Sequence, residues 1–260
     1  MTGSNAQSFD PVTFAREIED AALDGDWTIR HLTPTEAGPR PWLHRAARTD
    51  PGAPTVYLSS GIHGDEVSGP FALLEMLRQP DFFRAFEVTL FPILNPEGLS
   101  RNVRENATGI DLNRDYRNSK SAEVLGHIDV LKTLGRFDGA MMLHEDFEGI
   151  GAYVFELNDA DPPTLGQKII TAMGQYVPID TRPEIDEMPA HSGVISRNEI
   201  VQLRGPIENR PDWPEAIYLS LNHTKVSYTT ETPKPFPLAA RVQAQIAAVK
   251  TLLDALKRNS

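Results

Sequence analysis

Two short strings, far apart in the sequence, carry the side chains best suited to chemistry. His63 and Glu66 stand three residues apart in Gly-Ile-His-Gly-Asp-Glu, and His144 follows an apolar run in Met-Met-Leu-His-Glu-Asp. We expect Gly64 to favour the turn that brings the first two together. Two imidazoles and one carboxylate are a ligand set of catalytic zinc, which keeps a fourth position open for water. Either string alone is usually an ordinary polar segment, so the hypothesis depends on both.

A third acidic group and a long polar loop complete the candidate residues. Glu231 stands isolated in Tyr-Thr-Thr-Glu-Thr-Pro, where its carboxylate could activate a water molecule. The loop over residues 95–118 contains Arg101, Arg104 and Arg114 and few apolar residues, so packing alone does not explain its length. Arginine suits two-point binding of a carboxylate and stabilisation of an oxyanion. For Arg101 we expect only a solvated turn.

The apolar pattern predicts alternating strands and helices that would position these residues. Strands are expected near residues 42–44 and over 55–60, 86–94, 139–143, 152–157 and 226–231, with His144 at a strand end. Helices are expected over residues 12–23, 67–78, 121–134, 164–177 and 237–257. Turns are expected over residues 33–53, and mainly extended chain over 192–231. This alternation predicts an α/β fold with three α/β/α layers and a central mixed β-sheet.

The composition restricts the classes of protein and of site. The chain has 260 residues, of which 40% are hydrophobic, enough for a sizeable core. It contains no cysteine, so any metal must bind through nitrogen and oxygen atoms. The formal net charge of -11 argues against nucleic acid as the main partner, because phosphate binding needs clustered Lys and Arg.

The hydropathy profile carries expectations about organisation and location. Residues 1–10 are expected to form a polar tail and residues 11–260 a single domain, because no change of composition marks a second one. The N-terminal segment lacks the basic and apolar regions of a secretion signal, and no apolar window is long enough to span a membrane. We therefore expect a cytoplasmic protein with no membrane partner.

The order of the motifs resembles that of the M14 zinc carboxypeptidases. The shared features are His-x-x-Glu at 63–66, Asn-Pro-x-Gly at 95–98, an arginine, Gly-Ile-Asp-Leu-Asn-Arg at 109–114, and strands ending in His144 and Glu231. The resemblance runs from about residue 55 to residue 235, and 109–114 is its most specific motif. The compact spacing from Glu66 to His144 is closer to short bacterial members, related to peptidoglycan-peptide amidases and to succinylglutamate desuccinylase and aspartoacylase-like deacylases.

The resemblance implies a metal site and its catalytic partners. His63, Glu66 and His144 match the ligands of one Zn2+ per chain. Glu231 matches the general base and acid that activates the zinc-bound water, and Arg104 matches the arginine that polarises the carbonyl and stabilises its oxyanion. These roles agree with the chemistry of the side chains, since zinc lowers the pKa of bound water and a carboxylate can take its proton.

The resemblance also implies a substrate. Asn113 and Arg114 match the pair that grips a terminal carboxylate, so residues 11–260 would be a metallopeptidase domain that hydrolyses the amide bond next to a free C-terminal carboxylate. A deacylase of N-acyl amino acids is the first alternative, because its substrate also places a carboxylate beside an amide. A non-catalytic zinc-binding protein of the same fold is the second alternative. A serine hydrolase is set aside because no Gly-x-Ser-x-Gly string occurs.

The sequence departs from the digestive members of this family at one position. Those enzymes carry a mobile tyrosine about twenty residues before the catalytic glutamate, whereas residues 205–213 contain none. Tyr218 and Tyr228 stand nearby, but neither can be assigned that role from sequence.

The terminal residue of the substrate is expected to approach residues 215–217. Glu215, together with Glu145 and Asp146, could favour a basic terminal side chain. The alternative, that these acids face solvent, is left open, and the sequence does not give the oligomeric state.

Overall fold

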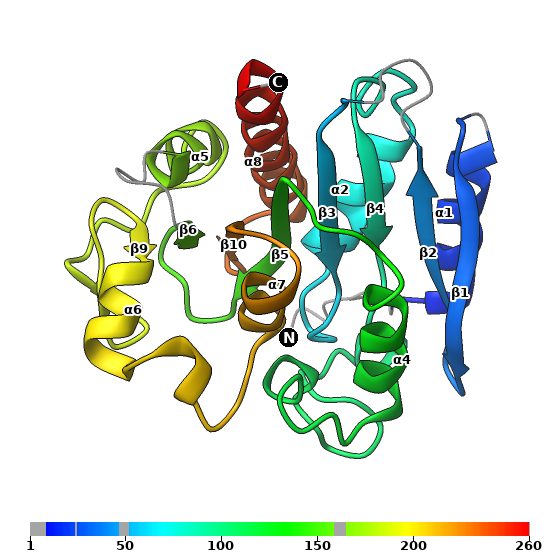
Figure 1. Ribbon diagram of the computed structural model, residues 1–260, viewed down its shortest axis with the longest axis horizontal. Coiled ribbons are helices and arrows are strands. Elements are labelled where there is room, and N and C mark those ends of the chain that lie inside the picture. The colour runs from blue at the N-terminus through cyan, green and yellow to red at the C-terminus, as the bar shows by residue number, and fades with distance from the viewer. Residues whose placement is uncertain (1–8, 24, 47–51, 159–164, 260) are drawn as a thin grey trace, which may run out of the picture.

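A mixed β-sheet of eight strands forms the centre of this computed structural model (Figure 1). The structure describes residues 9–23, 25–46, 52–158 and 165–259. From one edge to the other, the strands are β1 (Thr28–Thr35), β2 (Gly38–Arg45), β4 (Glu87–Phe91), β3 (Thr55–Ser60), β5 (Gly139–Asp146), β10 (Val226–Pro233), β6 (Tyr153–Asn158) and β9 (Val194–Ser196). A separate hairpin joins β7 (Glu184–Ile185) to β8 (Met188–Pro189).

Strand direction places the candidate residues at one edge of the sheet. The neighbours β4, β3, β5 and β10 run parallel, whereas β2 is antiparallel to β4 and β6 is antiparallel to β10. The predicted mixed sheet is therefore confirmed. Because the carboxyl ends of parallel strands meet at the same edge, the segments that follow β3, β5 and β10 lie together.

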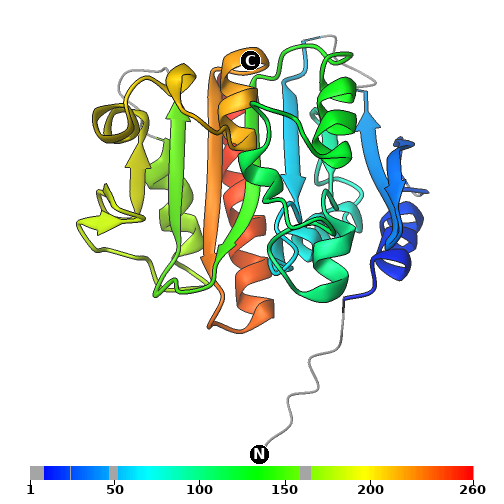
Figure 2. The same cartoon turned by 90° about the horizontal axis from the view of Figure 1, so that it is seen from below.

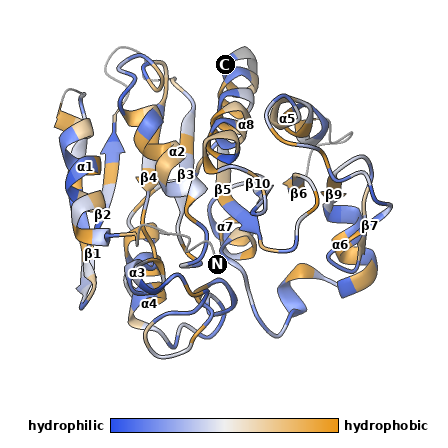
Figure 3. Ribbon diagram, turned by 180° about the vertical axis from the view of Figure 1, so that it is seen from behind, coloured by the Kyte–Doolittle hydropathy of each residue, from blue (hydrophilic) through white to orange (hydrophobic). Residues whose placement is uncertain are grey.

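Helices cover both faces of the sheet and confirm the three predicted layers. One face packs against α1 (Pro11–Leu23), α2 (Ser68–Leu77), α5 (Leu165–Met173) and α8 (Leu238–Asn259). The other packs against α4 (Ala122–Leu131), α6 (Arg197–Arg204) and α7 (Glu215–Asn222). Figure 2 shows α8 running beside β10 and β5, and Figure 3 shows hydrophobic and hydrophilic residues alternating along it. None of the described helices is both long and apolar enough to cross a membrane.

Some elements differ from the prediction. β1 was not predicted, because only Leu32 of its side chains is buried and no apolar alternation marks it. Residues 192–231 were expected to be mainly extended, but they contain α6, α7 and the short helix η2 (Ile207–Asn209). The signal for α6 was its capping box, in which Ser196 begins the helix and Glu199 closes the box.

The loop expected over 95–118 also contains helical turns. These are α3 (Pro96–Arg101) and η1 (Leu112–Arg114). Asn95 begins α3 by accepting a 2.9 Å hydrogen bond from the backbone N–H of Gly98, and Pro96 occupies the first position, where no N–H is needed. His144 lies inside β5 rather than at its end, because β5 continues to Asp146.

Part of the expected polar tail contacts the core. Residues 1–8 lie outside the described residues, but Phe9 packs against Phe14 and Phe71, with ring centroids 4.8 and 5.8 Å away. Asp10 accepts a 3.1 Å hydrogen bond from the backbone N–H of Val12 at the start of α1. Asp10 therefore caps the first turn of α1, and Phe9 makes the apolar contact just before it.

A buried ion pair ties α8 to the sheet. The guanidinium of Arg241 donates to Oε1 of Glu145, and Glu145 Oε2 accepts a 3.0 Å hydrogen bond from the backbone N–H of Ser68. Adjacent residues of a strand point to opposite faces, so Glu145 lies on the α8 side although His144 lies on the other side. Both charged side chains are buried.

Removing one charge of this pair is expected to destabilise the fold strongly. Arg241→Met should lower the free energy of unfolding by about 3–5 kcal/mol, because Glu145 is left buried without its partner. Arg78→Ala is the matched control, since the Arg78–Glu17 pair is exposed and such pairs contribute less than about 1 kcal/mol. Urea unfolding measures both variants, and equal losses would contradict the assignment of a buried pair.

Candidate active site

Three side chains from two segments converge at the carboxyl-end edge of β3 and β5. The Nδ1 atom of His63 lies 2.5 Å from Oε1 of Glu66, and the Nδ1 atom of His144 lies 2.8 Å from Oε2 of Glu66. Their ligand atoms all lie within 4.8 Å of one another, and all three residues are buried. The structure thus brings together the three residues predicted to bind the metal.

The contacts of this cluster fit a metal ion. Glu66 Oε2 is buried and has no aligned hydrogen bond to any described residue, although His144 Nδ1 is close to it. The other ring nitrogen of His63, Nε2, lies 3.3 Å from Oδ1 of Asp111, which leaves Nδ1 available as a ligand. Two imidazole nitrogens and a carboxylate are donors that zinc accepts.

Close backbone contact holds the turn between His63 and Glu66. A Cβ atom added at Gly64 would lie 1.9 Å from the carbonyl carbon of Gly98, so the two glycines bring their segments together. Asn95 donates from Nδ2 to the carbonyl oxygen of Ile62 at 3.2 Å. Gly64 does not adopt a left-handed conformation. Glycine is therefore required at position 64 because two segments of the chain pass close together there, and not because of the conformational freedom expected from the sequence.

Register across three strands places Glu231 beside the cluster. Glu231 on β10 pairs with His144 on parallel β5 and with Tyr153 on antiparallel β6. Paired residues project from the same face of a sheet, so these three side chains lie in one row. Tyr153 donates a 3.1 Å hydrogen bond from Oη to Oδ2 of Asp146, which is also on this face. The sequence did not identify Tyr153 as a site residue. Its only signal was its position in a predicted strand.

Asp111 links the metal cluster to Arg104. The Nε atom of Arg104 donates to Asp111 Oδ2 at 2.9 Å, and its Nη1 atom lies 3.3 Å from Nδ1 of His63 and 3.8 Å from Oε1 of Glu66. Burial acts to raise the pKa of Asp111, but His63 and Arg104 hold this pKa well below its usual range. Asp111 therefore orients both groups, a role that its place in the Gly-Ile-Asp-Leu-Asn-Arg motif did not indicate.

Contacts from residues 212–215 orient Asn113 and Arg114. The Asn113 Oδ1 atom accepts a 2.9 Å hydrogen bond from the backbone N–H of Glu215, which leaves its Nδ2 group as a donor. The Nε atom of Arg114 lies 3.4 Å from Oδ2 of Asp212. Tyr116 further donates from its backbone N–H to the carbonyl oxygen of Trp213 at 3.2 Å. Residues 212–215 therefore hold the predicted carboxylate-binding pair from outside its own loop.

Burial and neighbouring charges shift the pKa values of Glu66 and Glu231 in opposite directions. Burial alone would raise the pKa of Glu66, but the imidazoles of His63 and His144 lower it to about 2. For Glu231, burial and the negative charge of Glu66 raise the pKa to about 8, against the opposing effect of His144. Glu66 is thus ionised as a ligand must be, and Glu231 can hold or release a proton near neutral pH.

Glu145, Asp146 and Glu215, the acids expected to select a basic terminal residue, do not lie together. Glu145 points to the α8 side, and Glu215 is fully buried, where it accepts a hydrogen bond from the Tyr57 hydroxyl. The same hydroxyl lies 3.0 Å from Nε2 of His127. Of these acids, Asp146 lies on the site face and is not fully buried, so the structure does not form the expected group of three.

The buried Glu215 predicts a pH-dependent stability difference. Burial raises the pKa of Glu215, so the folded protein keeps its proton at pH values where the unfolded chain has released it. The free energy of unfolding should therefore fall as pH rises above about 4.5, by at most about 1.4 kcal/mol for each pH unit. Glu215→Gln should remove this slope, as measured by urea unfolding between pH 5 and pH 8. Parallel curves for the two proteins would contradict it.

Neither tyrosine that stood near the expected window belongs to the site. Tyr228 is buried on the α8 side of β10, where its Oη atom donates to Glu156 at 3.2 Å. Tyr218 packs against Tyr116, with ring centroids 5.7 Å apart. Among the described tyrosines, Tyr153 has the register that places it beside Glu231.

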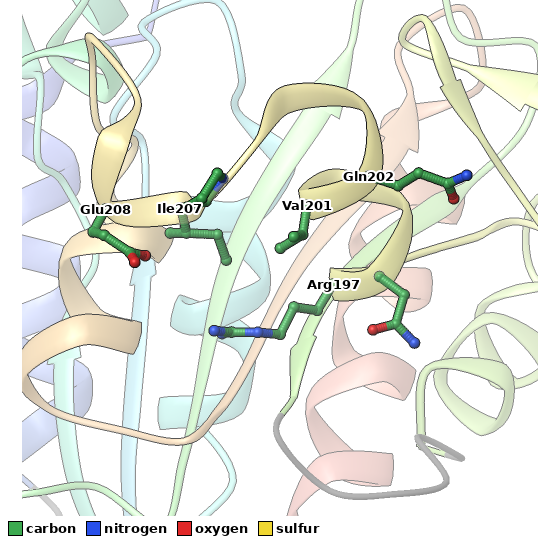
Figure 4. A pocket seen from close by; sticks show the side chains of 7 residues that line it. Arg197, Val201, Gln202, Ile207 and Glu208 are labelled. Atoms are coloured by element: carbon green, nitrogen blue, oxygen red, sulfur yellow. The ribbon is translucent and has the colours of Figure 1, made fainter.

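A surface groove between α6 and η2 is separate from this cluster. Figure 4 shows its lining side chains, and its volume is about 420 Å³. The groove is lined by Arg197, Asn198, Val201, Gln202, Pro206, Ile207 and Glu208, none of which belongs to the predicted site. It therefore takes no part in the chemistry of the metal cluster.

Known proteins share part of this sequence and its fold. The succinylglutamate desuccinylase/aspartoacylase catalytic domain matches residues 52–147, which include His63, Glu66 and His144. No curated protein sequence matches the chain. Among solved structures, a metallopeptidase candidate from Shewanella denitrificans has a TM-score of 0.79 and 26% identity, covering 93% of this chain and 88% of its own. One from Shewanella amazonensis has a TM-score of 0.79 and 28% identity, covering 94% and 92%.

A more distant likeness concerns the fold alone. Carboxypeptidase A from Helicoverpa armigera has a TM-score of 0.62 at 15% identity, and the match covers 93% of this chain and 70% of that one. The metallo-carboxypeptidase from Burkholderia cenocepacia has a TM-score of 0.67 at 15% identity, covering 95% and 69%. The arrangement of strands and helices is thus one that carboxypeptidases share.

Proposed function

We propose that this chain, a protein of the M14-like carboxypeptidase fold, is a zinc-dependent metallocarboxypeptidase that hydrolyses the amide bond next to a free carboxylate. One observation carries the proposal: the donor atoms of His63, Glu66 and His144 converge, with Glu231 on the neighbouring strand. Three protein ligands leave one position of the metal open, as in catalytic zinc sites, whereas structural zinc sites are closed by four protein ligands. The carboxylate of Glu231 beside the ligands therefore favours hydrolysis over structural metal binding.

Each residue of the cluster has a defined task in this proposal. Zinc, when bound by the three ligands, polarises the substrate carbonyl and lowers the pKa of water. Glu231, paired in register with His144 on the neighbouring strand, accepts a proton from the attacking water and returns it to the leaving amine. Arg104, held by Asp111, offers a guanidinium to the negative charge that develops on the carbonyl oxygen.

The terminal carboxylate of the substrate would be held by Asn113 and Arg114. Arg114 provides two-point hydrogen bonding to a carboxylate, and the Nδ2 group of Asn113 remains free to donate because its Oδ1 is occupied by Glu215. The half-exposed guanidinium of Arg114 can exchange its long 3.4 Å contact with Asp212 for such a ligand.

A deacylase of N-acyl amino acids is the second candidate function. The match of residues 52–147 to the desuccinylase and aspartoacylase domain favours it. Both substrates place an amide beside a carboxylate, so the same residues would serve either reaction. Hydrolysis of C-terminally varied peptides against N-acyl amino acids separates the two, and turnover of acyl amino acids alone would move the chain to the deacylase function.

Metal removal is expected to abolish activity. Purified protein should contain one zinc ion per chain, lose turnover on treatment with a chelator and regain it on addition of zinc, because the zinc would supply the activation of water that the proposed hydrolysis requires. His144→Ala should lose the metal, while His31→Ala, whose exposed side chain pairs with Glu19, should keep it. Full activity of chelated, metal-free protein would refute the proposal.

A further inference from the structure

One buried amide on α8 lies on the opposite side of β5 from the His144 imidazole. The side chain of Gln245 is fully buried, and its Nε2 atom donates a 2.8 Å hydrogen bond to the backbone carbonyl oxygen of His144. A carbonyl oxygen can only accept, so this contact fixes which end of the amide faces His144. Burying an amide is costly unless its polar atoms are bonded, so Gln245 contributes through these bonds rather than through packing alone.

Two threonines of β10 complete the surroundings of this amide. Thr230 donates a 2.6 Å hydrogen bond to Oε1 of Gln245, which holds the amide in the orientation that His144 requires. The hydroxyl of Thr232 lies 3.4 Å from the same carbonyl oxygen of His144 and 3.2 Å from the hydroxyl of Ser68. The side chains of Gln245, Thr230, Thr232 and Ser68 are all fully buried, and we call these four residues the α8 network.

The α8 network contacts the main chain of the ligand rather than its imidazole. The pairing of β3 with β5 ends at Leu143, whereas the pairing of β10 with β5 continues to Asp146. His144 therefore lies just beyond the point where one neighbouring strand has ended, and α8 adds a bond to its backbone there. The backbone position determines where the imidazole reaches, so fixing the carbonyl group helps to hold Nδ1 of His144 near Glu66.

Arg241, one turn earlier on α8, holds the next residue of β5. Among the described side chains of α8, Arg241 and Gln245 are the two buried polar ones, in a face made otherwise of valine, leucine and alanine. Residues four apart lie on the same side of a helix, and these two contact the consecutive residues Glu145 and His144. Glu145 also accepts a hydrogen bond from Ser68, which begins α2. Through Glu145, α8 is therefore joined to both segments that carry the metal ligands.

We propose that Gln245 is a positioning residue for the metal centre, which holds the backbone of His144 from the far face of the sheet. This inference rests on the metal site of the proposed function and not on the reaction. Without the amide, the backbone at His144 is freer to move when no ion is bound, and that freedom is lost on binding. The cost therefore falls on the affinity for zinc, while the number and charge of the ligands stay the same.

The test measures the zinc Kd of the full-length protein by competition with a chromophoric chelator, without any substrate. Gln245→Met keeps the length of the side chain but removes both hydrogen bonds, so we expect the zinc Kd to rise by about 10–100-fold. Leu252→Val is the matched control, because Leu252 packs on the same helix near Gly139 at the other end of β5. The control should lower the melting temperature and keep the zinc Kd. An unchanged zinc Kd in Gln245→Met, or an equal rise in Leu252→Val, would overturn the inference.

Thr230→Val tests the same network from its other end with a side chain of nearly the same shape. Valine leaves Oε1 of Gln245 without its donor, so the zinc Kd should rise by a smaller factor than in Gln245→Met. In the double variant the zinc Kd should equal that of Gln245→Met, because Thr230 acts through the amide. Additive rises would overturn this linkage. If Gln245→Met does not fold, Thr230→Val decides alone, and an unchanged zinc Kd in that variant overturns the inference.

Measuring zinc binding without substrate separates this inference from the proposed function. Weaker zinc binding in Gln245→Met supports the positioning role even if the unmodified protein hydrolyses neither peptides nor N-acyl amino acids, an outcome that would refute only the proposed function. Turnover by the unmodified protein together with an unchanged zinc Kd in Gln245→Met refutes only the positioning role. Absence of zinc binding by the unmodified protein would overturn both.

Discussion

Replacing Glu231 by glutamine is expected to lower kcat by about 10²–10⁴-fold, the usual contribution of a general acid and base. Glutamine has nearly the same shape but cannot accept the proton of the attacking water. The three ligand side chains are unchanged, so the variant should keep its zinc, as measured by metal analysis together with steady-state kinetics.

The control for Glu231 is a glutamate distant from the cluster. Glu17 on α1 pairs with Arg78 on the surface, so Glu17→Gln should retain the activity of the unmodified protein. Near-normal turnover in Glu231→Gln would remove Glu231 from the role of base, whereas loss of zinc in that variant would show that it acts through the metal site. Either result would require a different proton acceptor.

Gly64→Ala is expected to have the largest effect on the fold around the site. The new Cβ atom would lie 1.9 Å from the carbonyl carbon of Gly98, and backbone atoms on both sides leave no flexible side chain to move aside. The turn that presents His63 and Glu66 must then separate from the Asn95–Gly98 segment. We expect a loss of about 3 kcal/mol in the free energy of unfolding and loss of bound zinc.

A glycine in open surroundings provides the comparison for Gly64→Ala. Gly126 lies inside α4, where an added Cβ atom would meet only Thr33 Oγ1 at 3.9 Å. Gly126→Ala should therefore keep the metal and gain up to about 1 kcal/mol, because alanine favours a helix over glycine. Thermal unfolding and zinc content measure both variants. Retained zinc in Gly64→Ala would show that the two segments can separate without disturbing the ligands.

Patterns local in sequence predicted most of the sheet and its covering helices. The buried strand β3 and the amphipathic helix α8 each carry a continuous signal, an apolar run in one and helical spacing in the other. β1 and α7 carried weaker signals: β1 is an exposed edge strand, and α7 has only eight residues. Edge strands and short helices take their conformation from neighbours, which residue periodicity does not describe.

The sequence by itself determined the donor types of the site and their order along the chain. His63, Glu66, His144 and Glu231 stand in recognisable strings near or just after the carboxyl ends of predicted strands, where parallel sheets place their chemistry. The absence of cysteine was equally decisive, since it left only nitrogen and oxygen ligands.

Only the tertiary structure decided which other residues surround the three metal ligands and Glu231. Tyr153 stands beside Glu231 through the register of β6 on β10, and Glu215 is buried against Tyr57 rather than open to substrate. The contact of Gly64 with Gly98 likewise joins two segments that the sequence separates. Such contacts depend on how strands pair and how loops pack across the fold, and residue spacing along one segment carries no information about a partner elsewhere.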